Sequence, residues 1–198
     1  MTLTPNGSSG TAQRGSIRAI LRGMSLIARG RAEGMNCFGD SPRAILGSLI
    51  PGFGLMAGAA VEAFTQGDSG RALGGLLAPS VALLAPSVLS HELARYWGRE
   101  AFWGRYIVAF NWCQWLLPIV AMILITTLTF LQASGVTGRG GMKLLIVGLA
   151  GYALWLNWFV ARHGLALSAG RAGWFVAGVN LGTMALVVIP SLFGGTHK

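Results

Sequence analysis

Charge is scarce in this sequence, and acidic charge is the scarcer kind. Only 11% of the 198 residues are charged, whereas an ordinary soluble domain carries about 25% charged residues. More than half of the residues are hydrophobic, and the mean hydropathy is +0.59. An apolar surplus of this size cannot be buried in a soluble core. The composition therefore predicts a chain that is embedded in lipid.

Cysteine and the usual catalytic constellations are also nearly absent. Cys37 and Cys113 are the two cysteines, and we expect both to be small apolar fillers rather than a structural disulfide. His91 and Glu92 begin like the zinc-protease motif HExxH, but Arg95 stands where the second His is required. Paired carboxylates and a nucleophile beside a base are missing as well. We therefore predict a non-enzymatic protein with no catalytic residue, no metal site and no cofactor.

Long charge-free windows are what the sequence does contain. Five of them are long enough for one spanning helix of about 17 to 25 residues. A segment in lipid must satisfy its own backbone hydrogen bonds, so these windows are expected to be helical. The predicted fold is all-α, a polytopic transmembrane bundle of five helices within a domain at 41–194. The predicted spans are 44–64, 72–90, 106–131, 144–161 and 172–193.

The third predicted span lies in the longest charge-free window, the 33 residues between Arg105 and Arg139. Twenty-six helical residues at about 1.5 Å each extend over roughly 39 Å, more than the roughly 30 Å of a hydrocarbon core. We therefore expect this helix to tilt or to begin in the interface. Its first third carries Asn111 and Gln114 between aromatic side chains, and any functional site is expected there.

The basic residues flank the apolar windows and form no single basic face, so the positive-inside rule explains them better than a nucleic-acid partner does. With five spans and a cytoplasmic N-terminus, 11 Lys and Arg lie inside and 4 outside. A four-span alternative, in which the Gly-rich first window is only re-entrant, gives 10 inside and 5 outside. The predicted topology is N-in and C-out, although charge alone barely separates the two. The expected location is a cell inner membrane.

Two segments precede the first span. Residues 1–15 are polar and are predicted to be a disordered tail. No signal peptide is recognised there, so the first span is expected to direct insertion. Residues 16–40 form a cytoplasmic segment that begins with an amphipathic helix lying on the membrane, and a docking helix for a protein partner is the alternative. Its apolar residues are Ile17, Ile20, Leu21, Met24 and Ile27, and its lipid-surface residues, expected to contact anionic headgroups, are Arg18, Arg22 and Arg29.

Small residues mark two helix-packing positions. Gly54 with Gly58 and Gly178 with Gly182 are GxxxG pairs, which let two helix backbones approach closely. We favour packing within one chain over formation of a homo-oligomer.

Proline marks a third feature, in the second span. The sequence LAPSV occurs twice there, seven residues apart, and places Pro79 and Pro86 on nearly the same side. Each removes a backbone donor, so the helix is expected to bend. A structural kink is favoured over a transport site of the broken-helix kind.

Polar side chains in three spans are predicted to meet in the cytoplasmic leaflet. The members of this candidate cluster are Asn111, Gln114, Asn157 and Asn180. We predict a structural clasp of cross-helix hydrogen bonds, with a solute or ion site as the alternative. Carboxylates and lysines, the usual signature of ion coupling, are missing from these spans. The seven tryptophans fall near the same face and predict a collar for lipid headgroups or a partner protein.

The five-span layout and the stretch ARHGLALSAGRA at 161–172 resemble the bacterial Yip1-like membrane proteins, loosely over 41–193. The resemblance implies a five-helix membrane fold. Eukaryotic relatives in that family contact small GTPases, but their acidic and aromatic motif of the DLYGP kind is absent here, so that partner does not carry over. No functional residue is implied.

The sequence as a whole predicts a scaffold or accessory component in membrane or envelope organisation. Its expected partners are the lipid bilayer and a possible protein partner or second copy. The alternative is a small-solute transporter or channel with a polar site in the cytoplasmic leaflet.

Overall fold

A computed structural model describes residues 16–65, 69–134 and 141–193. The predicted disordered tail at 1–15 lies outside these ranges. The described residues form helices joined by short turns, with no strand among them, as the sequence predicted. In chain order the elements are α2 (Ile17–Ala28), the 3₁₀ helix η1 (Ala32–Cys37), α3 (Pro42–Thr65), α4 (Ser69–Tyr96), α5 (Glu100–Gln114), α6 (Leu116–Ala133), α7 (Gly141–Gly164) and α8 (Ala169–Phe193).

Four helical stretches in the described residues are long and apolar enough to cross a membrane: Pro42–Glu62, Glu100–Ala133, Gly141–Gly164 and Ala169–Ile189. They correspond to the first, third, fourth and fifth predicted spans. At most 22% of the most apolar window of any of them is buried inside the protein. Side chains of this kind are stable in lipid and not in water, so the structure supports a multi-pass membrane protein. The predicted second span lies within α4 and is not among the four.

The longest predicted helix is broken where the sequence analysis expected it to continue. α5 ends at Gln114, Trp115 joins the two helices, and α6 begins at Leu116. Pro118 explains the break, because it has no N–H for the carbonyl of Gln114 and its ring crowds that carbonyl. The third span therefore consists of two helical segments that meet beside its polar residues.

The buried core lies at one end of the molecule. Apolar side chains from α2, η1, α4, α5, α7 and α8 pack together there, and we call this cluster the hub. α5 is central to it, with four consecutive buried residues from Tyr106 to Ala109. The largest fully buried side chains of the hub are Ile27, Phe38, Tyr106, Ile107, Leu156, Leu165 and Phe175.

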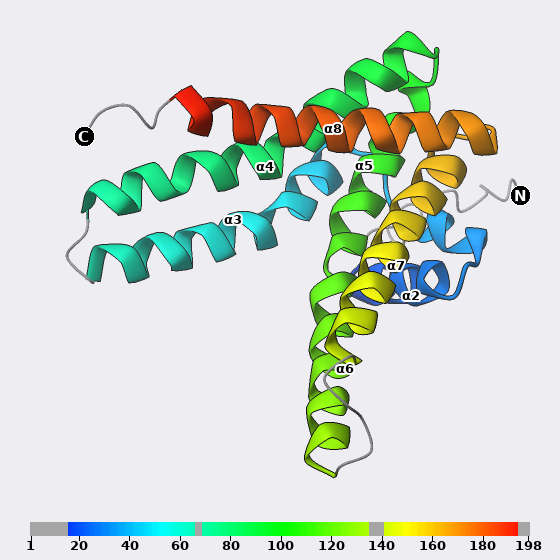
Figure 1. The fold of residues 1–198 in the computed structure, drawn as a ribbon. Helices are drawn as coiled ribbons and strands as arrows, with labels where there is room; N and C mark the ends of the chain where they lie inside the picture. Colours follow the sequence, from blue (N-terminus) through cyan, green and yellow to red (C-terminus); the bar gives the residue numbers. More distant parts are fainter. Residues whose placement is uncertain (1–15, 66–68, 135–140, 194–198) are drawn as a thin grey trace, which may run out of the picture.

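Two groups of helices extend from the hub in different directions (Figure 1). The antiparallel α3 and α4, with α8 along α4, form the first arm. α6 and the first half of α7 form the second arm. α3, α7 and α8 carry many exposed large apolar side chains, as α6 does, so both arms present an apolar surface. We call the region where the arms diverge the fork.

Three turns on the hub side share one local geometry. After α2 the amide of Gly30 donates to Ile27 O at 2.8 Å, and after α4 the amide of Gly98 donates to Arg95 O at 3.0 Å. Both glycines have positive φ, +73° and +64°, as a Schellman C-cap requires. Ala166 occupies the same position after α7 with φ +50°, a conformation that costs a residue with a Cβ about 1 to 2 kcal/mol.

α2 contributes more to the protein core than a helix lying on the membrane would. Its N-cap is Ser16, whose side chain accepts from the amide of Ala19 at 3.3 Å. Three of its five predicted apolar contacts, Ile20, Met24 and Ile27, are buried in the hub. The other two, Ile17 and Leu21, stay exposed. The apolar face of α2 is therefore divided between the hub and the outside of the protein.

Candidate functional site

The predicted polar cluster is not one clasp but two separate pairs and a single residue. Asn111 on α5 donates from Nδ2 to Ser48 Oγ on α3 at 2.9 Å. Ser48 is 2% exposed, and its hydroxyl donates a hydrogen bond to Ile45 O at 2.7 Å. This chain of two hydrogen bonds joins α5 to α3, and its acceptor residue was not predicted.

The second pair joins α5 to α7. Gln114 donates from Nε2 to Asn157 Oδ1 at 3.4 Å, a long hydrogen bond. Asn180 makes no bond to either pair; its Nδ2 donates to Val176 O of its own helix at 2.8 Å. The prediction that the three Asn side chains bond across helices was therefore wrong for Asn180, whereas Asn111 and Asn157 each bond to a side chain of another helix. The three side chains face different neighbours and do not form one cluster.

Two adjoining cavities lie at the fork. The first, about 430 Å³, lies between α3, α4, α5 and the start of α6. The second, about 410 Å³, lies between α4, α5 and α8. Pro86, Phe110 and Gln114 line both. Either volume falls in the range of small-molecule sites, roughly 300 to 1,000 Å³.

The cavities are mainly apolar and carry no charged side chain. Ser48, Asn111 and Gln114 are the polar members of the first cavity, and Asn180 and Thr183 join Gln114 in the second. Thr183 Oγ1 is buried and has no hydrogen-bond partner in the described part of the chain. A buried polar atom without a partner costs free energy. A ligand group that bonds to this hydroxyl would remove that cost.

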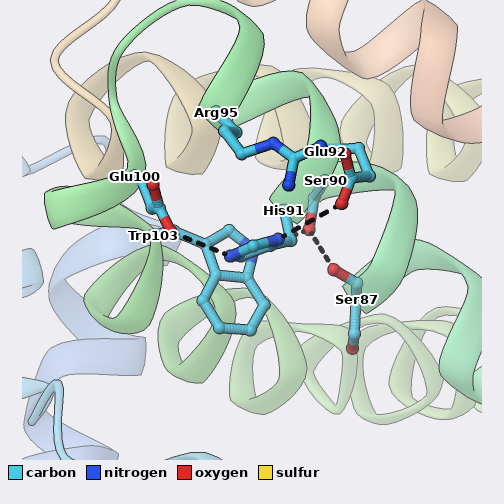
Figure 2. Close-up of polar contacts among 7 residues, drawn as sticks. All are labelled: Ser87, Ser90, His91, Glu92, Arg95, Glu100 and Trp103. Carbon is cyan, nitrogen blue, oxygen red and sulfur yellow. Dashed lines mark hydrogen bonds and ion pairs between the residues drawn. The ribbon is translucent and has the colours of Figure 1, made fainter.

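A second polar group lies at the turn between α4 and α5 (Figure 2). Trp103 donates from Nε1 to Ser90 Oγ at 3.0 Å, and Ser90 donates to Ser87 O at 3.1 Å. Ser90 is fully buried. The His91 ring stands edge-on to Trp103, with 4.8 Å between ring centroids. These contacts fix the last turns of α4 against the start of α5.

Carboxylates flank His91 on both sides. Its Nδ1 is 3.7 Å from Glu92 Oε1, and its Nε2 is 3.5 Å from Glu100 Oε1 (Figure 2). Arg95 pairs with the other oxygen of Glu92 at 2.6 Å. The carboxylates are half or more exposed, so these pairs contribute little stability individually. The described residues contain no group of three or more His, Cys, Asp or Glu side chains that could hold a metal ion.

The two GxxxG pairs lie in different surroundings. A Cβ at Gly178 would lie 3.1 Å from Leu93 Cδ2, and one at Gly182 would lie 2.8 Å from Leu89 Cδ1, so α8 approaches α4 closely. A Cβ at Gly54 or Gly58 would meet no neighbouring atom of the described chain within 4 Å. The expected packing of the α3 pair within the chain is therefore not what the structure has. Gly52 instead faces Leu83 of α4.

The remaining predicted residues lie near the hub. Arg18, Arg22 and Arg29 are exposed on or next to α2. Five of the seven tryptophans pack on the hub: Trp97, Trp103, Trp112, Trp115 and Trp158.

The two cysteines are free thiols and differ in exposure. Cys113 is 2% exposed, whereas Cys37 is only half-buried. Cys113 therefore lies in packed protein and not in an open passage.

Three functional candidates were missed from sequence. Ser48 is a lone hydroxyl in an apolar window, which was a usable signal. Thr183 lies three residues after Asn180, close to it on the same helix, which was also a usable signal. The contacts of His91 with Glu100 and Trp103 form only because the α4–α5 turn brings α5 back beside α4, and no local sequence pattern predicts that turn.

Comparison with family models, with curated proteins and with solved structures finds no match to this chain. The assignment of a function therefore depends on the geometry above.

Proposed function

We propose that this chain is a non-enzymatic, multi-pass membrane protein that acts as a scaffold or accessory component in membrane or envelope organisation. The supporting observation is how its intramembrane polar groups are used. Asn111 bonds to Ser48, and Gln114 bonds to Asn157. Polar side chains that join helices in this way stabilise a fixed bundle, by about 0.6 kcal/mol each on average.

The proposed topology has five spans, with the N-terminus inside and α4 as the second span. Two observations support it. α3, α5 and α8 begin at the hub and α4 and α7 end there, so successive helices alternate between leaving the hub and returning to it. Arginines, among them Arg31, Arg99 and Arg162, also lie at the hub end, which the positive-inside rule assigns to the cytoplasm. We propose a bacterial inner membrane, in keeping with the resemblance to Yip1-like proteins.

The exposed arginines of α2 give the hub a surface for anionic headgroups. Arg18 and Arg22 lie beside the exposed Ile17 and Leu21. An apolar anchor beside basic groups is the arrangement that binds the interface of an anionic membrane, with each basic residue contributing about 1 kcal/mol.

The reactivity of Cys113, a buried residue of α5, tests whether an aqueous passage reaches the core of the protein. In a Cys37→Ser variant reconstituted in vesicles, a water-soluble maleimide should leave Cys113 unmodified until the protein is unfolded with detergent. The matched Cys113→Ser variant, which keeps Cys37, reports that the reagent is active. Rapid modification of Cys113 in the folded protein indicates an aqueous passage and overturns the scaffold.

A small-solute transporter remains the second candidate, because one observation favours it. Trp115 and Pro118, at the break between α5 and α6, line the first cavity, and broken helices occur at transport sites. Its mainly apolar lining fits a solute poorly. Uptake of a polar solute by vesicles that contain the folded protein would establish this second function.

A further inference from the structure

We infer that the fork cavities bind an uncharged amphiphile from the bilayer, a lipid with hydrocarbon chains and a hydroxyl or carbonyl head group, of which a diacylglycerol is the simplest example. This proposal rests on the part of the proposed function that places the chain in a membrane. It does not depend on the scaffolding role. The argument starts from the shape of the molecule. The arms diverge from the hub (Figure 1), and in a bilayer the space between two apolar arms is open to hydrocarbon chains.

The cavities extend that space into the protein. Pro86, Phe110 and Gln114 line both, so the two cavities adjoin at these side chains, and the proposed ligand places one hydrocarbon chain in each. Apolar walls from helices of the first arm and from α5 suit hydrocarbon. A polar solute would have to leave water for a mainly apolar lining, at a cost that few hydrogen bonds can offset.

The charge of the lining identifies the head group. Among the described residues no Lys, Arg, Asp or Glu lines either cavity, so a phosphate or ammonium group would be buried there without a partner, which is costly. A neutral group meets no such cost. This distinguishes the fork cavities from the α2 surface, where arginines favour anionic lipid.

Unused hydrogen-bonding groups are available for such a head group. Thr183 Oγ1 is buried without a partner. The amide of Gln114 makes one long bond, to Asn157, although a primary amide has two donor hydrogens and an acceptor oxygen. Gln114 and Thr183 both line the second cavity, so a carbonyl or hydroxyl of a ligand there has side-chain hydrogen-bonding groups in its lining.

The test uses the full chain in phosphatidylcholine nanodiscs with a photoactivatable diacylglycerol. We expect saturable labelling that excess unlabelled diacylglycerol prevents and that maps to the second half of α4, the end of α5 and α8. Ala82→Phe fills the first cavity and should lower labelling by about tenfold. Ala150→Phe adds the same ring to an exposed position of α7 outside the cavities and should leave labelling unchanged.

A milder variant protects the test against a folding defect. Thr183→Val removes only the hydroxyl and should weaken diacylglycerol binding about three- to tenfold, the loss expected for one hydrogen bond. Thermal unfolding of each variant is measured in parallel.

Three results overturn the proposal. One is uniform labelling of all exposed helices that Ala82→Phe does not change. Another is stronger labelling of the fork by a photoactivatable phosphatidylglycerol than by the diacylglycerol. The third is diacylglycerol binding by the Thr183→Val variant that is as strong as binding by the parent protein. None of these results bears on Cys113 reactivity, so the proposed function is tested separately.

Discussion

The side-chain amide of Asn111 lies 2.9 Å from Ser48 Oγ and joins α5 to α3 across 63 positions of sequence. Both residues line the first fork cavity, so this hydrogen bond fixes one wall of the fork. It is the shorter of the two cross-helix bonds that replace the predicted clasp.

Ser48→Ala should destabilise the folded protein by about 0.6 kcal/mol and by no more than about 1.7 kcal/mol, the average and the maximum measured for hydrogen bonds between membrane helices. The loss is read from detergent-induced unfolding followed by tryptophan fluorescence. A double-mutant cycle with Asn111→Leu isolates the pair. A coupling energy of zero would show that the two side chains do not bond in the membrane.

Asn157→Leu should cost less than Ser48→Ala, because the Gln114–Asn157 bond is long at 3.4 Å. We expect a loss below about 1 kcal/mol and an unchanged fold in the same unfolding assay. A loss larger than that of Ser48→Ala would mean that Asn157 has a further partner.

Ala166→Gly should stabilise the protein by about 0.5 to 1 kcal/mol. Ala166 has a positive φ; relief of its strain, about 1 to 2 kcal/mol, exceeds the added unfolded-state entropy of glycine, about 0.4 to 1 kcal/mol. Gly98→Ala is the reciprocal change at the turn after α4 and should destabilise by a similar amount. If both variants unfold like the parent protein, these turns do not have Schellman geometry.

Gly182→Leu should destabilise by about 1 to 3 kcal/mol or more, because its side chain must displace Leu89 from between α8 and α4. Gly58→Leu is the matched control. No described neighbour meets a Cβ at Gly58, so its stability should stay within about 0.5 kcal/mol of the parent. Equal losses in the two variants would show that the α3 pair also packs tightly, against a second copy of the chain.

Local patterns predicted the helices well. A long apolar stretch in lipid must form a helix to satisfy its own backbone hydrogen bonds, whatever the rest of the fold is. The ranges 144–161 and 172–193 fall within α7 and α8, which extend a few residues further toward the hub. Pro118, four residues after Gln114, is the sequence signal for the break at Trp115, and the apolar run that continues through both helices obscures it.

Pairing between helices was not predictable in the same way. Hydropathy gives the depth of Asn111, Asn157 and Asn180 but not the direction in which their helices are rotated. Rotation follows from packing at the hub, where Gly164 lets α7 approach Tyr106 of α5. For the same reason the sequence could not tell that Gly182 faces a neighbour and Gly58 does not.

The account depends most on the orientation of the hub, and labelling of one introduced cysteine tests it. In a Cys37→Ser background, Ser168→Cys places an exposed thiol in the turn between α7 and α8, and Ser134→Cys places one at the far end of α6. With five spans, a membrane-impermeant maleimide should modify position 168 only from the cytoplasmic face and position 134 only from the opposite face. Modification of position 168 from the opposite face would contradict the five-span topology and the cytoplasmic hub.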